Sequence, residues 1–141
     1  MIIGRLFSET TLDVLKKGIE GTLARNQAIA NNIANVDTPS YQRAEVSFED
    51  QLRKVLRGEG ITGRRTDSAH FIIGGAPEIA AIRPFVEIDR ETRFRPDRNN
   101  VNIDQEMAAL AENTQKNLEF TELLSRRYDS LRNVIRTAGQ A

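Results

Sequence analysis

Few side chains in this 141-residue sequence could take part in catalysis. The chain has one histidine, His70, in the segment TDSAHF, and it has no cysteine. A catalytic base or a metal-bound water needs further groups to hold it in place, and no cysteine or second histidine can share a metal with His70. This residue is therefore better explained as a hydrogen-bonding side chain at a turn.

The carboxylates of the central region do not form a catalytic pair. Asp67, Glu87, Asp89 and Glu91 are interleaved with arginines in the sequence, a pattern typical of a solvated face. The glycine pair at 74 and 75 lacks the lysine and the serine or threonine of a phosphate-binding loop. We therefore expect neither an enzyme nor a cofactor or metal site.

Composition also bounds the partners. The chain has 20 basic and 20 acidic residues, so its charge gives no reason to expect nucleic acid or an anionic membrane as a partner. Its hydrophobic content of 39% is low for a compact domain, so partners could complete its core. The first residues, MIIGRLFSETTLD, predict no cleaved signal peptide, and no apolar run is long enough to span a membrane.

A long helix is predicted at each end of the chain. Near the N-terminus, seam residues recur at alternating spacings of three and four, as in a coiled coil, and Thr10 with Asp13 could cap the helix. This seam consists of Leu12, Leu15, Ile19, Thr22, Asn26, Ile29, Ile33 and Val36. Near the C-terminus, Asn102 with Gln105 offers a cap. The second seam consists of Ile103, Met107, Leu110, Thr114, Asn117, Thr121, Leu124, Tyr128, Leu131, Ile135 and Ala138.

We expect the two helices to fold back antiparallel, with Asn26 near Asn117 and Tyr128 in the core. An ordinary helical hairpin would explain both seams. Apolar residues off the seams favour a second interpretation, in which the helix pair packs with neighbouring copies. These off-seam residues are Leu23, Leu118, Phe120, Leu123 and Val134.

The middle of the chain is different. Ser47 and Asp50 could cap a short amphipathic helix that ends at Gly58 and Gly60. Glycine, proline and charge then predict a loop-rich insert at 58–100, with strand-like pieces at 71–74 and 85–88 and a solvated linker at 90–100. The predicted fold class is mostly α: long terminal helices paired as an antiparallel coiled coil, with a short helix and an insert carrying minor β structure. The predicted divisions are 1–40, 41–100 and 101–141.

The stretch NNIANVDTPSYQR, from Asn31 to Arg43, joins an asparagine-rich helix end to a turn at Pro39. Tyr41 could pin the chain against the helices or contact a neighbour. The stretch resembles the N-terminal motif of the bacterial flagellar axial proteins, in which such a helix end precedes Thr-Pro-Gly-Tyr and a basic residue. Ser40 stands where that family most often has glycine.

Three further segments are similar to the proximal rod proteins of this family, and the resemblance spans nearly the whole chain. They are FEDQLRKVL at 48–56, TDSAHF at 66–71 and RPDRNNVNIDQEMAALAEN at 95–113. Arg98 and Asn102 stand where glycine and aspartate are expected.

The resemblance implies a structural subunit of the proximal rod of the flagellar basal body, which assembles helically through its terminal helices. It also implies type III export and assembly in the periplasm. The implied partners are other copies of the chain, the basal-body adaptor FliE, the rod protein FlgC and the export gate. The helix-end asparagines are expected to hydrogen-bond adjacent subunits. The residues expected at assembly contacts are Leu12, Leu15, Ile19, Asn26, Ile29, Asn31, Asn32, Ile33, Asn35, Thr38, Pro39, Tyr41, Asn99, Asn100, Asp104, Glu106, Met107, Leu110, Asn117, Leu124, Tyr128, Leu131 and Ile135.

Two alternatives stay open from the sequence. A cytosolic coiled-coil adaptor or export chaperone would share the seams but would not need the asparagine-rich turn. It should be an ordered dimer in solution, whereas a rod subunit should be a monomer with frayed ends. An enzyme built on the 58–100 insert would depend on His70 alone.

Overall fold

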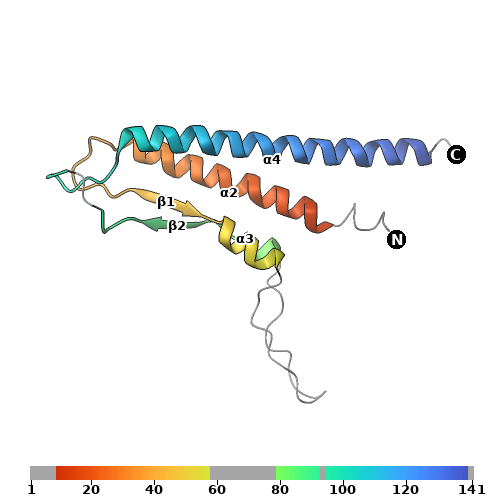
Figure 1. Ribbon diagram of the computed structural model, residues 1–141, viewed down its shortest axis with the longest axis horizontal. Helices are drawn as coiled ribbons and strands as arrows, with labels where there is room; N and C mark the ends of the chain where they lie inside the picture. The colour runs from red at the N-terminus through yellow and green to blue at the C-terminus, as the bar shows by residue number, and fades with distance from the viewer. Residues whose placement is uncertain (1–8, 58–78, 93–94, 140–141) are drawn as a thin grey trace, which may run out of the picture.

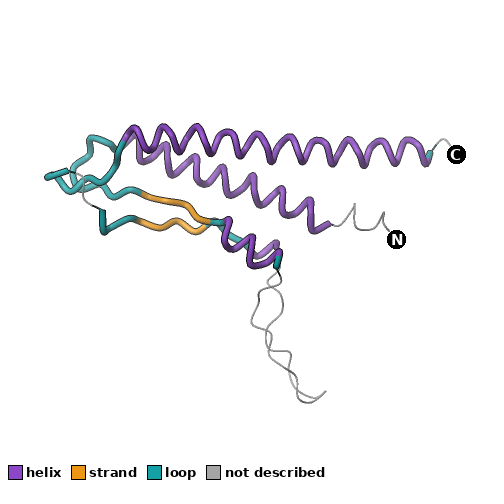
Figure 2. Tube along the Cα trace, viewed as in Figure 1, coloured by secondary structure: helices purple, strands orange, loops and turns teal. Residues whose placement is uncertain are grey.

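The computed structural model describes residues 9–57, 79–92 and 95–139. Two long helices, α2 (Glu9–Ala34) and α4 (Ile103–Ala138), lie side by side and run antiparallel (Figure 1). A two-stranded ribbon and a short helix lie along this pair (Figure 2). These are β1 (Ala44–Ser47), β2 (Phe85–Ile88), α3 (Glu49–Leu56) and the 3-10 turn η1 (Ile79–Ala81). The prediction of a mostly helical fold with paired terminal helices is confirmed.

The helix ends differ in how well the sequence predicted them. Helix α2 already includes Glu9, so Thr10 lies within it and the predicted cap at Thr10 is wrong. Helix α4 begins as predicted, because the Asn102 side chain accepts hydrogen bonds from the backbone N–H groups of Asp104 and Gln105. Helix α2 ends at Ala34, so the last predicted seam residue, Val36, lies in the turn that follows.

Polar side chains join the middle of the two helices. Asn113 Nδ2 donates to the backbone oxygen of Thr22 at 2.8 Å and to Asn26 Oδ1 at 2.7 Å. Asn117 Nδ2 donates to Thr22 Oγ1 at 2.7 Å. The predicted Asn26–Asn117 pair is therefore wrong by one helical turn, since Asn113 is the partner of Asn26.

The buried face of α4 agrees with the predicted seam at every second position. At the positions between, it lies one residue earlier in the sequence. Glu106 and Asn113 are buried, and Phe120 contacts α2 at Gly18, where an added Cβ would lie 2.9 Å from the ring. Met107 and Tyr128 are instead 53% and 45% exposed, so the expected core position of Tyr128 is wrong. Positions 106, 113 and 120 lie in the seam because each contacts a small or polar residue of α2: Asn32, Thr22 and Gly18, respectively. Leu110, Asn117, Leu124 and Leu131 keep their predicted side and are partly buried.

One aliphatic and one aromatic side chain pack the ribbon and the residue after it against the helix pair. Val46 and Phe48 are 2% exposed, and the Phe48 ring lies against Gly21 of α2, where an added Cβ would come within 2.4 Å of a ring carbon. The Arg25 guanidinium lies 5.0 Å above the same ring and forms an ion pair with Glu49 at 2.6 Å. Arg25 thereby ties α2 to the start of α3.

Predictions for the middle region were partly right. The strand at 85–88 is confirmed, but it pairs antiparallel with residues 44–47, which had not been predicted as a strand. The first residue before α3 is Phe48, and no side chain caps this helix, so the predicted Ser47 and Asp50 cap is wrong. The segment at 71–74, His70, and the glycines at 58 and 60 lie outside the described residues.

Candidate assembly surface

Asn32 is the centre of a buried polar network beneath the asparagine-rich turn. Its Oδ1 accepts from the Ala44 backbone N–H at 2.9 Å and from the Tyr41 hydroxyl at 3.2 Å. Its Nδ2 donates to the Ala44 backbone oxygen at 2.8 Å and to Glu106 Oε2 at 3.0 Å. Asn32 has no exposed surface, so the expectation that it bonds adjacent subunits is wrong. An amide both donates and accepts, and it therefore pairs with β1 as another strand would.

Arg43 neutralises the buried carboxylate of this network. Glu106 has no exposed surface, and Arg43 Nε donates to its Oε1 at 2.5 Å, while Arg43 Nη1 donates to Glu45 at 3.0 Å. Burial lowers the pKa of Arg43, but the hydrogen bonds and negative charges of Glu106 and Glu45 outweigh it and raise that pKa above its ordinary value. Burial and, to a lesser extent, the charge of Glu106 raise the pKa of Tyr41. The network is thus a paired buried charge, in which loss of one partner is costly.

Asn99 and Asn100 close the turn from the other side. Asn99 Nδ2 lies 2.9 to 3.0 Å from the backbone oxygens of Asn35, Val36 and Thr38. Asn100 Oδ1 accepts from the Arg43 backbone N–H at 2.6 Å. Both asparagines are buried, so the prediction of a solvated linker at 90–100 is wrong at its end. The sequence showed these amides but not the carbonyl groups that they would meet.

Two residues in the loops that connect the ribbon to the helix pair have positive backbone φ angles. They are Ser40, with φ of 61°, and Arg98, with φ of 68°, and glycine was expected at both positions. The Ser40 backbone N–H donates to the Asp97 oxygen at 2.9 Å, and Gln42 Nε2 donates to the Arg98 oxygen at 2.7 Å. The left-handed turns are therefore retained without glycine, at a steric cost.

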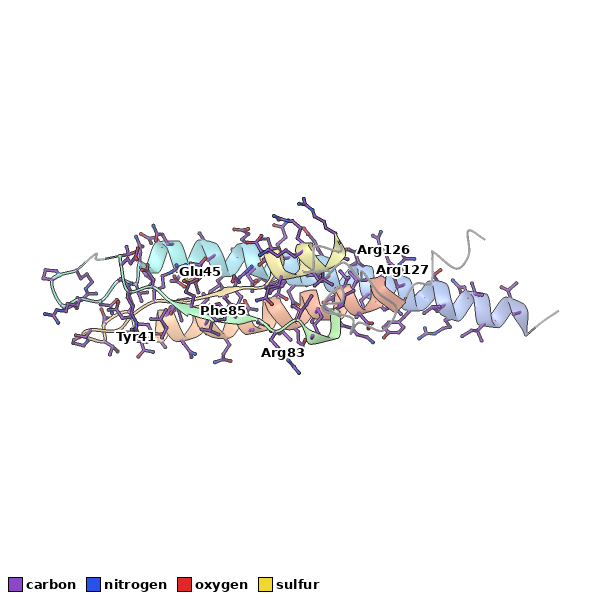
Figure 3. All side chains as sticks on the ribbon, turned by 90° about the horizontal axis from the view of Figure 1, so that it is seen from below. Tyr41, Glu45, Arg83, Phe85, Arg126 and Arg127 are labelled. Carbon is purple, nitrogen blue, oxygen red and sulfur yellow. The ribbon has the colours of Figure 1, made fainter. Side chains whose placement is uncertain are left out.

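The helix pair carries a strip of apolar and small polar residues on the side turned away from the ribbon, which we call the bare face. Residues three and four apart lie on one side of a helix, and the members from the antiparallel helices face the same way. Leu23, Met107 and Leu118 are 56%, 53% and 64% exposed. Figure 3 shows the opposite side, where the ribbon lies in front of the helices. The bare face consists of Leu12, Ile19, Leu23 and Ala30 of α2 and Ile103, Met107, Thr114, Leu118, Thr121, Ser125 and Tyr128 of α4.

The residues expected at assembly contacts fall into three groups. Those buried within the chain are Leu15, Ile29, Asn32, Asn99, Asn100 and Glu106. Those partly buried are Leu12, Ile19, Asn26, Ile33, Asn35, Tyr41, Leu110, Asn117, Leu124 and Leu131. Those exposed are Asn31, Thr38, Pro39, Asp104, Met107, Tyr128 and Ile135.

The off-seam residues also separate. Leu23 and Leu118 belong to the bare face, whereas Leu123 and Val134 are exposed on another side of α4. Phe120 lies in the helix–helix seam, so its expected off-seam position is wrong. The sequence analysis does not predict roles for Asn113 and Arg25. Asn113 follows Glu106 by seven residues, so it lies on the same side of α4, and this spacing could have suggested it as a buried partner for Thr22.

Other functional sites have little support in the described part of the chain. Among its residues, no group of three or more histidine, cysteine, aspartate or glutamate side chains could hold a metal ion. None of its helices is both long and apolar enough to cross a membrane.

Comparison with known proteins identifies the family. No protein-family model matches the chain. A flagellar basal body rod protein FlgB from Borrelia hermsii is 30% identical over 136 residues, which cover 91% of this chain and 97% of that protein. The FlgB proteins of Bacillus subtilis (strain 168) and Salmonella typhimurium (strain LT2) are 30% and 32% identical, and the matches cover 95% and 82% of their lengths and 92% and 79% of this chain. The adaptor and chaperone alternatives are not favoured by these relatives, and the chain belongs to the FlgB family of flagellar basal body rod proteins.

Proposed function

We propose that this chain is a non-catalytic subunit of the proximal rod that assembles helically through its two long helices. Its FlgB relatives are structural basal-body rod proteins, and this chain is a structural rod subunit by family membership. The proposal adds the surface that makes the contacts, the helical mode of assembly and the position within the rod.

The observation that carries the proposal is the bare face. Its α4 residues lie along one side of the helix from Ile103 to Tyr128. None of them is charged, although 28% of the chain is charged. Depletion of charge and enrichment of large apolar groups are typical of the core of an interface. An exposed apolar strip of this length is uncommon on a protein that acts alone. The ribbon covers part of the opposite side of the helix pair, whereas no described element covers the bare face.

A rod also requires contacts that do not close into a dimer. Two different patches on each subunit must meet, so that each added copy leaves a new site open. The proposed partners are further copies of this chain, the adaptor FliE, the rod protein FlgC and the export gate. The proposed route is type III export without a cleaved signal peptide, followed by assembly in the periplasm.

Charged substitutions on the bare face test this proposal. Leu118→Glu and Met107→Glu should abolish swimming and rod formation, because each would bury an unpaired carboxylate in the interface. Gln115→Glu is the matched control, since Gln115 is an exposed residue of the same helix outside the bare face. Rods would be counted by electron microscopy of basal bodies, and chain levels would be checked by immunoblot. Normal rods with both bare-face variants would contradict the proposal.

A further inference from the structure

A groove runs between α4 and the ribbon, on the side of the helix pair opposite the bare face. Strand β1 is the ribbon strand that borders it (Figure 3). The cavity has a volume of about 290 Å³, enough for one large side chain. It is lined by Arg25, Ala28, Ile29, Arg43, Ala44, Glu45, Val46, Glu49, Ala109, Glu112, Asn113 and Lys116. Alanine and aliphatic side chains thus form its apolar lining, and charged side chains surround them.

The charged groups of the groove are paired with one another. Arg25 pairs with Glu49 at 2.6 Å, Arg43 with Glu45 at 3.0 Å, and Lys116 with Glu112 at 2.7 Å. A charged occupant would have to break one of these ion pairs. The groove therefore favours an uncharged occupant with an apolar body.

One buried acceptor of the groove has no partner among the described residues. Asn113 is 1% exposed, and its Oδ1 accepts no hydrogen bond from the described chain. Its Nδ2 donates to two oxygens of α2, from Thr22 and Asn26. Because only the amide nitrogen can donate to these oxygens, the other end of the amide is the oxygen. A buried oxygen without a donor is costly. A donor that reached this oxygen from the groove would satisfy it, so the groove favours an uncharged side chain with one hydrogen-bond donor.

We propose that this groove binds the Tyr128 side chain of a second copy of the chain. Tyr128 is 45% exposed, and its hydroxyl group makes no hydrogen bond to another residue in the described ranges. Of the two tyrosines, Tyr41 already donates to Asn32. A phenol combines the apolar body and the single donor that the groove requires, and tyrosine is enriched at interfaces for this reason.

The charges at the C-terminal end of α4 and at the rim of the groove favour such a contact between copies. Residues 126–138 carry four arginines and one aspartate, a net charge of +3. In the three ion pairs at the groove the acid is the more exposed partner: the side chains of Glu45, Glu49 and Glu112 are 64%, 39% and 69% exposed, against 25%, 19% and 42% for Arg43, Arg25 and Lys116. Figure 3 shows Arg126 and Arg127 far along the molecule from Tyr41. The basic end that carries Tyr128 is thus complementary to the exposed carboxylates at the rim of the groove in another copy. This inference rests on the proposed assembly of copies with one another.

Cross-linking tests the contact directly, because the chain has no native cysteine. Ala109→Cys in the groove and Ser125→Cys, one turn before Tyr128, would be introduced together, and isolated basal bodies would be treated with a short bismaleimide. We expect covalent dimers of the chain. The matched control is Ala111→Cys with Ser125→Cys, since Ala111 is an exposed α4 residue on the side away from the groove, and it should give none.

Tyr128→Phe gives a second, independent readout. It removes only the hydroxyl group, so it should leave unfolding of the monomer unchanged while weakening rod assembly about fivefold, as expected for one lost hydrogen bond. Rods that contain the cysteine variants but yield no dimer, or wild-type assembly of Tyr128→Phe, would overturn this inference and leave the proposed function standing. Absence of even the wild-type chain from basal bodies would contradict the proposed function itself.

Discussion

Asn32 Nδ2 and Glu106 Oε2 form a 3.0 Å hydrogen bond between residues 74 positions apart, and neither side chain has exposed surface. This bond joins the end of α2 to the first turn of α4. Asn32 also binds both backbone groups of Ala44, so the same side chain holds β1 in place. The asparagine-rich turn therefore sets the geometry of the helix pair, and through it the shape of the bare face.

Replacement of Asn32 should destabilise the monomer itself. Asn32→Ala removes four hydrogen bonds and leaves buried groups of Ala44 and Glu106 without this partner. We expect the free energy of unfolding to fall by about 2–4 kcal/mol, as measured by urea denaturation. Asn31→Ala is the control, because Asn31 is exposed, and it should change stability by less than about 0.5 kcal/mol. Equal stability of the two variants would contradict the role assigned to Asn32.

Glycine at the two left-handed positions should stabilise the chain. Ser40→Gly and Arg98→Gly relieve the clash of Cβ with the backbone at positive φ. The greater entropy of glycine in the unfolded chain offsets part of this gain. We expect an increase of about 0.5–1 kcal/mol for each variant in the free energy of unfolding. Ser40→Ala keeps the Cβ and should give no increase; a similar gain from Ser40→Ala would exclude strain as the cause.

Two glycines of α2 provide a matched pair of packing tests. Alanine at either position favours the helix by about 1 kcal/mol. At Gly21 its methyl would lie 2.4 Å from the buried Phe48 ring, so the net effect of Gly21→Ala should be a loss of about 1–2 kcal/mol in thermal or urea unfolding. At Gly18 the neighbour is the partly exposed Phe120, which can move outward, so Gly18→Ala should be close to neutral. Loss of stability in Gly18→Ala alone would reverse this assignment.

The ion pair between Arg25 and Glu49 should make stability depend on acid pH. Burial raises the pKa of Glu49, but hydrogen bonds and the charge of Arg25 outweigh it and lower the pKa below its ordinary value of 4.5. The unfolded chain therefore binds the proton more readily, so the stabilisation is complete above pH 4.5 and is lost as pH falls through the folded pKa. Urea denaturation from pH 6 to pH 3 should show a shallower loss for Glu49→Gln than for the wild type. Glu119→Gln, at an exposed α4 position, is the control, and identical slopes for Glu49→Gln and the wild type would contradict the prediction.

Sequence patterns were enough to predict the two terminal helices, the Asn102 cap and the strand at 85–88. These features depend on periodicity and on residues close in the chain, and such signals are local. The asparagine-rich turn and its resemblance to flagellar axial proteins also pointed correctly to the FlgB family.

The buried face of α4 and the partners of the asparagines depend on contacts that exist only in the folded chain. A hydrophobic pattern could not place Glu106 and Asn113 in the seam, because their burial depends on Arg43, Asn32 and Thr22, which lie far away in the sequence. Likewise, Gly18 makes room for Phe120 only once the two helices have met. Met107 and Tyr128 were left on the outside for the same reason, and the strip predicted as a helix–helix seam became part of the bare face. Buried polar groups are positioned by the partners that satisfy them, and those partners are brought together by the fold.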